Sequence, residues 1–96
     1  MSIVTVVAKL VVKDDAVESV KSELLKLIIP TRQEDGCIEY RLHQDNASPG
    51  VFIFYENWKD SASLERHLLT THYRNYIAAV SGALLEKEVH KMTRLA

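Results

Sequence analysis

Two segments of this chain, residues 3–12 and Val51–Trp58, are apolar at nearly every position. A strand with one face in water alternates apolar and polar residues, whereas a strand that is apolar on both sides is buried on both sides. Such strands belong in the middle of a sheet, because edge strands are the ones that carry charge. The two segments therefore predict a sheet with two central strands that need cover on both faces.

An amphipathic helix is expected after the first strand. Asp15 and Glu18 have the spacing of a capping box, which predicts that the helix begins there. Pro30 lacks an amide donor, so the helix is expected to end or kink near residues 28–29, with a last turn reaching as far as Glu34. Asp35 and Gly36 then predict a turn. The apolar side of this helix comprises Val17, Val20, Leu24, Leu27 and Ile28.

Residues 37–44 alternate and predict a half-exposed strand, followed by a turn over residues 45–50. The side expected to be apolar holds Ile38, Tyr40 and Leu42. In the next strand, one side holds Phe52, Phe54, Glu56 and Trp58, and the other holds Val51, Ile53, Tyr55 and Asn57.

Asp60 is a plausible N-cap for a helix over residues 60–69, and a break is expected at Thr70-Thr71. Thr71 is expected to cap a second helical segment over residues 72–81, which Gly82 ends. Residues 84–95 predict a final strand of mixed polarity, with Glu86, Glu88 and His90 on its polar side.

The predicted order is β-α-β-β-α-β in a single domain over residues 1–96. Placing the two mixed strands at the edges gives an antiparallel sheet of order 4-1-3-2, an α+β ferredoxin-like arrangement with both helices on one face. The other face stays apolar in its middle, and an isolated monomer would expose it. We therefore expect a homodimer that packs sheet face against sheet face.

Composition limits the partners. The 12 basic and 13 acidic residues are interspersed and give a formal net charge of −1, which argues against a nucleic-acid backbone as partner. No apolar run approaches the roughly 20 residues of a membrane helix. Cys37 is the one cysteine, and the start of the chain lacks the pattern of a signal peptide, so we expect a cytoplasmic protein.

The candidate site lies between the third strand and the later helices, where it would form a pocket for a flat organic ligand. The strand side supplies Phe52, Phe54, Glu56 and Trp58, and the helices supply His67, His72, Tyr73 and Tyr76. Each has a plainer interpretation, since tryptophan and tyrosine usually pack and a lone histidine usually forms a hydrogen bond at a boundary. A metal held by Glu56, His67 and His72 is not expected, because histidines five residues apart share a helical face only if the chain bends at Thr70-Thr71.

Several motifs together resemble the antibiotic biosynthesis monooxygenase family, and in particular its small bacterial quinol monooxygenase branch. The motifs are Pro30-Thr31-Arg32, the run from Glu34 to Tyr40, Asp45 with Pro49 and Phe52, Tyr55-Glu56-Asn57-Trp58, His67, and Thr71-His72-Tyr73. The resemblance implies a dimeric α+β barrel that uses O2 to oxidise a quinol-like or polyketide aromatic, without metal, flavin or other cofactor.

In that chemistry the protein deprotonates a phenol, and the resulting anion reduces O2. The resemblance implies His72 or His67 as the base, Glu56 or Tyr76 as an orienting group, and Trp58 and Phe54 as walls against the substrate ring, with Phe52 and Tyr73 beside them.

Two alternatives stay open. One is an isomerase of a phosphorylated, sugar-like quorum signal, for which Arg32, Arg41 or Lys9 would supply the cationic pocket. The other is a dimer that binds a small ligand without chemistry. Haem degradation, another activity of the family, is not expected, because the first strand has no asparagine and Ile77 falls near the position of the haem ligand.

Overall fold

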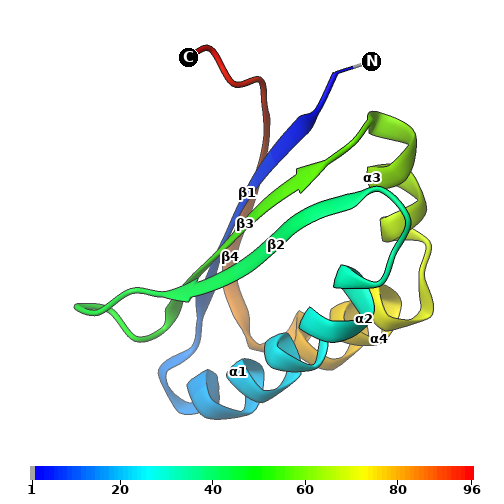
Figure 1. Ribbon diagram of the computed structural model, residues 1–96. Coiled ribbons are helices and arrows are strands. Elements are labelled where there is room, and N and C mark those ends of the chain that lie inside the picture. Colours follow the sequence, from blue (N-terminus) through cyan, green and yellow to red (C-terminus); the bar gives the residue numbers. More distant parts are fainter. Residues whose placement is uncertain (1) are drawn as a thin grey trace.

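The computed structural model describes residues 2–96 as one antiparallel sheet with its helices on a single face (Figure 1). The strands are β1 (Val4–Val12), β2 (Cys37–Gln44), β3 (Val51–Trp58) and β4 (Leu84–Met92). The helices are α1 (Val17–Lys26), α2 (Ile28–Arg32), α3 (Ser61–Leu68) and α4 (Thr71–Val80), with 3-10 turns at Asp14–Ala16 and Ser81–Ala83. The strand order β2-β3-β1-β4 confirms the predicted ferredoxin-like α+β sheet.

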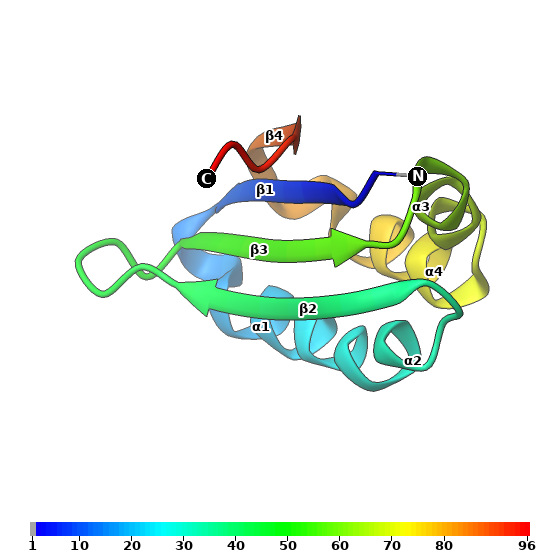
Figure 2. The ribbon, with the colours of Figure 1, turned by 45° about the horizontal axis from the view of Figure 1, so that its top comes forward.

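The two central strands are the two that were apolar on both sides. β1 and β3 run antiparallel, with Val4 opposite Trp58 and Val11 opposite Val51 (Figure 2). Every second residue of each strand points to the helices, and all of these except Val4 are buried. The inward residues are Val6, Ala8, Leu10, Val12, Phe52, Phe54, Glu56 and Trp58.

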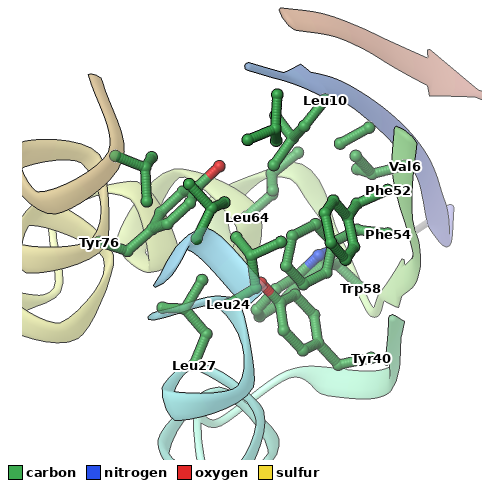
Figure 3. Close-up of a cluster of buried hydrophobic side chains, with 14 residues drawn as sticks. Val6, Leu10, Leu24, Leu27, Tyr40, Phe52, Phe54, Trp58, Leu64 and Tyr76 are labelled. Carbon is green, nitrogen blue, oxygen red and sulfur yellow. The ribbon is translucent and has the colours of Figure 1, made fainter. Parts of the chain in front are cut away.

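The core lies between this sheet face and the helices (Figure 3). Trp58, Leu24 and Leu10 have no exposed surface. The apolar rows of the helices meet the sheet as their spacing predicts, with Val20, Leu24, Leu27, Leu64, Tyr76 and Val80 all buried. Each fully buried aliphatic or aromatic side chain contributes about 1.5–3 kcal/mol to folding. The core thus fixes the helix layer against the sheet.

Two predictions about helix starts are wrong in detail. A 3-10 turn over Asp14–Ala16 precedes α1, so Ala16 and not Asp15 occupies the N-cap position, and no side chain caps this end. Thr70, not Thr71, caps α4, where its Oγ1 accepts a hydrogen bond from the Tyr73 amide. Asp60 caps α3 as predicted and accepts from the Ser63 amide.

Two predictions about the edge strands are also wrong. The pairing of β2 with β3 shifts between Cys37 and Glu39, so Ile38 leaves the alternation and is exposed instead of facing the core with Tyr40. The last strand ends at Met92 and not at residue 95. No helix within residues 2–96 is long and apolar enough to cross a membrane.

The sheet face away from the helices is open. Its middle carries Val7, Val11, Val51, Ile53 and Tyr55, interrupted by Lys9. The edge strands border it with Glu39, Arg41 and His43 on one side and Glu86, Glu88 and His90 on the other. Apolar residues thus occupy the centre of this face and charged residues its rim.

Gly36 controls how the segment before β2 approaches α3. Its φ is 90°, in the left-handed region that side chains disfavour. A Cβ atom at this position would overlap Oγ and Cβ of Ser63 on α3. Glycine therefore lets the chain pass directly against α3, which brings Glu34, two residues earlier, within reach of that helix.

We predict that Gly36→Ala destabilises the protein by at least about 2 kcal/mol, because the left-handed conformation and the overlap with Ser63 both oppose a side chain. Gly82→Ala is the matched control, since a Cβ there meets nothing within 4 Å. Urea unfolding measures both free energies. Equal, small losses for the two variants would contradict this role of Gly36.

Candidate functional site

The bend between α3 and α4 is built by Thr70. Its hydroxyl donates to the carbonyl of His67 at 2.7 Å and accepts from the amide of Tyr73 at 3.3 Å. One threonine thus ties the last turn of α3 to the first turn of α4. The bend brings together His67 and His72, which a continuous helix would place on different faces.

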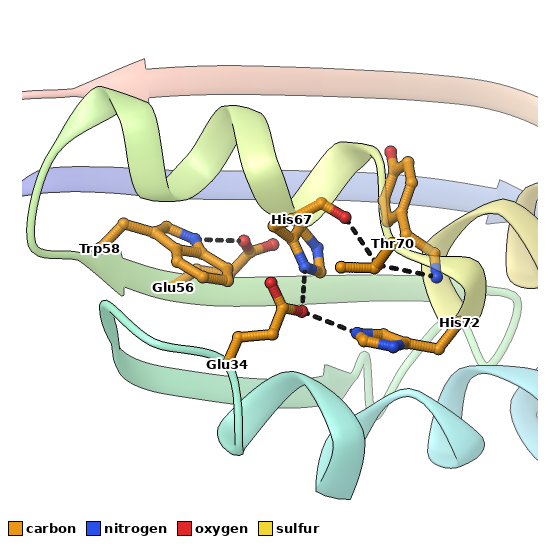
Figure 4. A network of polar contacts seen from close by, with 7 residues as sticks. Glu34, Glu56, Trp58, His67, Thr70 and His72 are labelled. Atoms are coloured by element: carbon orange, nitrogen blue, oxygen red, sulfur yellow. Dashed lines mark hydrogen bonds and ion pairs between the residues drawn. The ribbon is translucent and has the colours of Figure 1, made fainter.

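Glu34 joins the two histidines. Its Oε2 lies 2.7 Å from Nδ1 of His67 and 2.7 Å from Nε2 of His72 (Figure 4). The His67 side chain is 2% exposed, that of Glu34 12% and that of His72 26%, so the cluster runs from the interior to the surface. An ionised carboxylate only accepts hydrogen bonds, so Nδ1 of His67 carries its proton and Nε2 is left as an acceptor.

A small cavity of about 40 Å³ lies beside the His67 ring. It is lined by Val6, Ala8, Tyr40, Phe54, Glu56, His67, Leu68, Tyr73, Tyr76, Lys87 and Val89. One water needs about 10–15 Å³ of such space, so the cavity has room for a few waters or a diatomic gas. A buried polar group from the helices, His67, and one from the sheet, Glu56, both line this cavity.

Glu56 is the sheet's polar group at this cavity. It is 6% exposed, and its Oε1 accepts a hydrogen bond of 2.9 Å from the indole Nε1 of Trp58. Burial raises the pKa of Glu56 to about 7, the charge of Glu34 adds to the rise, and the bond from Trp58 opposes it. Near neutral pH this carboxyl is therefore able to give or take a proton.

Burial acts on His67 in the opposite sense, because it disfavours the charged ring. It lowers the pKa of His67, although the hydrogen bond and the charge of Glu34 work against it. A neutral imidazole with a free Nε2 suits a general base.

Lys87 and two tyrosines close the cavity on its outer side. Lys87 Nζ donates to the hydroxyl of Tyr73 at 3.3 Å and lies 5.7 Å and 5.8 Å from the ring centroids of Tyr73 and Tyr76. Tyr76 is 5% exposed, and burial raises its pKa above the ordinary value. Lys87 comes from the edge strand β4, for which the sequence predicted mixed polarity but no site residue.

Some of the site residues predicted from the sequence line the cavity, and the others do not. The cavity is lined by Phe54, Glu56, His67, Tyr73 and Tyr76. Trp58 packs behind it, with its ring centroid 4.7 Å from that of His67, and Phe52 is core. His72 stands on the far side of Glu34, in a surface hollow with Glu23, Lys26, Leu27, Asn75 and Tyr76.

Sequence reasoning missed Glu34 and Lys87 as site residues. Gly36 was the sequence signal for Glu34. A glycine turn that passes close to a helix brings a carboxylate two residues away within reach of that helix. The signal for Lys87 was its place in a strand of alternating polarity, two residues from Val89 and on the same side.

A larger hollow of about 680 Å³ lies elsewhere, on the open sheet face. Ile3, Thr5, Ile38, Tyr55, Asn57 and Met92 are among its lining residues. It holds no histidine and no carboxylate, so we place the chemistry at the smaller cavity and assign the larger hollow to the open face.

Glu34, His67 and His72 could also approach a metal ion, since their ligand atoms lie within 4.8 Å of one another. Glu34 thus takes the place that the sequence analysis considered for Glu56. Both ring nitrogens, however, point to the same carboxylate oxygen at hydrogen-bond distance. The arrangement is that of a carboxylate that orients two imidazoles.

The basic residues considered for a phosphate lie away from the cavity. Arg32 donates through Nε and Nη2 to the carbonyl of Tyr40, at 3.1 Å and 2.9 Å. Arg41 pairs with Glu39, and Lys9 lies on the open face opposite Ile53. The structure therefore gives the sugar-phosphate alternative no cationic pocket built from these three residues.

Comparison with known proteins agrees with this architecture. The family model for "Antibiotic biosynthesis monooxygenase" matches residues 3–79. The chain is 36% identical to "Putative monooxygenase Rv0793" of Mycobacterium tuberculosis over 86 residues, which cover 90% of this chain and 83% of that protein. It is 30% identical to "Probable quinol monooxygenase YgiN" of Escherichia coli over 80 residues, covering 75% of this chain and 77% of that protein.

Solved structures of similar proteins have the same fold. The crystal structure of PA3566 from Pseudomonas aeruginosa superposes with a TM-score of 0.95 at 32% identity, covering 100% of this chain and 97% of that one. The structure of Rv0793 superposes with a TM-score of 0.93 at 31% identity, covering 99% and 97%.

We predict that Glu56→Gln stabilises the protein at pH 8 by at most about 3 kcal/mol, a gain that disappears toward pH 5. The folded-state pKa of Glu56 lies above its unfolded value of 4.5, so its stabilising contribution is complete below 4.5 and is lost as pH rises through about 7. Glutamine cannot ionise, and its carbonyl can still accept from Trp58.

Thermal unfolding of both proteins across this pH range measures the effect, with the exposed Glu88→Gln as the matched control. A pH-independent difference between Glu56→Gln and the parent protein would show that Glu56 is not held near neutrality by burial.

Proposed function

This chain belongs to the antibiotic biosynthesis monooxygenase family, and from that premise we propose that it oxygenates a small quinol-like aromatic with O2, without a metal or flavin. One observation carries the proposal. A buried histidine, His67, is held through Nδ1 by Glu34, and its ring lines a cavity next to the carboxyl of Glu56. This is the arrangement that a base for a phenol needs.

The first step is proton transfer. A phenol hydroxyl in the cavity gives its proton to Nε2 of His67, and Glu34 stabilises the imidazolium that forms. The phenolate is electron-rich and passes electrons to O2. One oxygen atom then bonds to a ring carbon while the other leaves as water, so that a quinol and O2 give a hydroxyquinone and water.

Glu56 and Tyr76 supply the remaining polar contacts. With a pKa of about 7, the Glu56 carboxyl can donate a hydrogen bond to a substrate oxygen when protonated and return the proton to the departing oxygen. Tyr76, whose pKa burial raises, stays protonated and can only orient. Phe54 and Tyr40, with ring centroids 5.1 Å apart, form an aromatic wall for the substrate ring.

The cavity must widen to admit a ring. Its volume is about 40 Å³, whereas a cavity that takes up benzene measures roughly 150 Å³. Leu68 and Val89 are 39% and 50% exposed and line the cavity together with Lys87, so this side can open without disturbing the core. We propose that substrate enters between α3 and β4.

We also propose that the open sheet face forms a homodimer. Its apolar centre and charged rim have the composition of a protein interface. Tyr55 is 38% exposed in the single chain, and the hollow beside it opens on the same face. A second copy would cover both.

We predict that His67→Ala lowers kcat with a quinol at least about 100-fold, because the base is lost, with little change in the fold. Glu34→Gln should lower kcat about tenfold, because a neutral amide stabilises the imidazolium less. Glu65→Ala, at an exposed position of α3 outside both the cavity lining and the open face, is the control.

Oxygen uptake across a panel of quinols provides the rates, and circular dichroism checks the fold. Full turnover by His67→Ala would show that His67 is not the base. An inactive parent protein that still binds quinols would favour the binding dimer.

We predict that Tyr55→Glu converts the dimer to a monomer at low micromolar concentration, because it places a charge at the centre of the apolar face. Leu69→Glu is the control, since Leu69 is 65% exposed just after α3, on the other side of the molecule. Sedimentation velocity measures both. A parent protein that sediments as a monomer would refute the proposed dimer.

A further inference from the structure

The charges on β4 are sorted by face. Lys87, Val89 and Lys91 pair with Leu10, Ala8 and Val6 of β1, which are buried beneath the helices. These three β4 residues therefore lie on the helix side of the sheet. Glu86 and Glu88 pair with Val11 and Lys9 and lie on the open face. The edge strand thus presents cations to the helix side and carboxylates to the opposite face.

Lys87 is the cation that reaches the cavity. It lines the cavity with Tyr73 and Tyr76, donates to the Tyr73 hydroxyl, and lies over both rings. Within residues 2–96 it forms no ion pair with a carboxylate. Its charge at the mouth is therefore available to a ligand.

The inner end of the cavity has the opposite character. Glu56 lines it, and Glu34 lies just behind the His67 ring. Burial raises the pKa of Glu56, and the negative charge of Glu34 adds to this rise. A negative group on a ligand would be repelled from this end and attracted to Lys87.

The rest of the cavity lining is mainly apolar. It includes Val6, Ala8, Phe54, Leu68 and Val89. A ligand that matches all three zones has a hydroxyl at one end, an aromatic body, and an acidic substituent at the other.

We propose that this cavity selects an anionic aromatic, a hydroxylated ring whose acidic substituent is held at the mouth by Lys87 while its phenol points inward to His67 and Glu56. Tyr73 assists by placing a hydroxyl beside the ammonium group. The inference deepens the proposed oxygenation by naming its substrate class, and it rests on that function only for the statement that the bound ring is a substrate.

The test is a binding measurement that needs no turnover. The probes are 6-hydroxy-2-naphthoate, which has its hydroxyl and carboxylate at opposite ends, and 2-naphthol, its neutral counterpart. Quenching of Trp58 reports binding, because it is the one tryptophan and its ring contacts His67 behind the cavity. The readout is the ratio of the two Kd values at neutral pH and low salt.

Lys87→Gln should weaken binding of the naphthoate about fivefold and leave 2-naphthol unchanged, the size expected for one partly exposed ion pair. Lys87→Arg should keep the preference, and added salt should reduce it in the parent protein. Lys91→Gln, a lysine on the same side of β4 but outside the cavity lining, should behave as the parent.

An unchanged Kd ratio in Lys87→Gln, or an equal loss of both ligands, would overturn the inference, as would the same effect from Lys91→Gln. The two proposals fail separately. Charge preference without oxygen uptake from any acidic or neutral quinol would refute the oxygenation alone, and oxygen uptake without charge preference would refute the substrate class alone.

Discussion

The pair of hydrogen bonds on one oxygen of Glu34 is the contact on which the site depends. Through it, segments from three parts of the chain become one unit: the loop before β2, the end of α3 and the start of α4. The contact fixes which nitrogen of His67 is free, and it does so at a position where the ring has almost no water around it. Neighbouring aromatic rings pack against the imidazole, but the carboxylate is the group that decides which ring nitrogen carries the proton.

Two residues make that contact possible, and both lie outside the cavity lining. Gly36 lets the loop pass against Ser63, one helical turn before His67. Thr70 ties the two helices at their bend, which brings His72 back toward Glu34. The site is therefore a product of the helix layer, while the sheet provides Glu56, the aromatic wall and the cation at the mouth.

Much of the architecture was accessible from the sequence, because burial leaves a direct trace in residue alternation. Strands apolar on both sides had to be central, which fixed the strand order, and the inward side of β3 followed from its alternation. The details that the sequence did not predict depend on contacts between distant parts of the chain. The exposed position of Ile38 depends on a register shift with β3, and the role of Glu34 depends on a loop path set by contact with α3. The alternation of β4 puts Lys87 on the side of Val89, but only the pairing of Lys87 with Leu10 shows that this side faces the helices.

We propose that His67 carries its proton on Nδ1, against Glu34, which leaves Nε2 free, and that burial keeps its ring neutral near pH 7. Nitrogen chemical shifts of the histidine rings, recorded by NMR on uniformly labelled protein, report protonation and tautomer directly. We expect the Nδ1–H tautomer for His67 in the parent protein and loss of that fixed tautomer in Glu34→Ala. A charged His67 ring, or a proton on Nε2 in the parent protein, would contradict it.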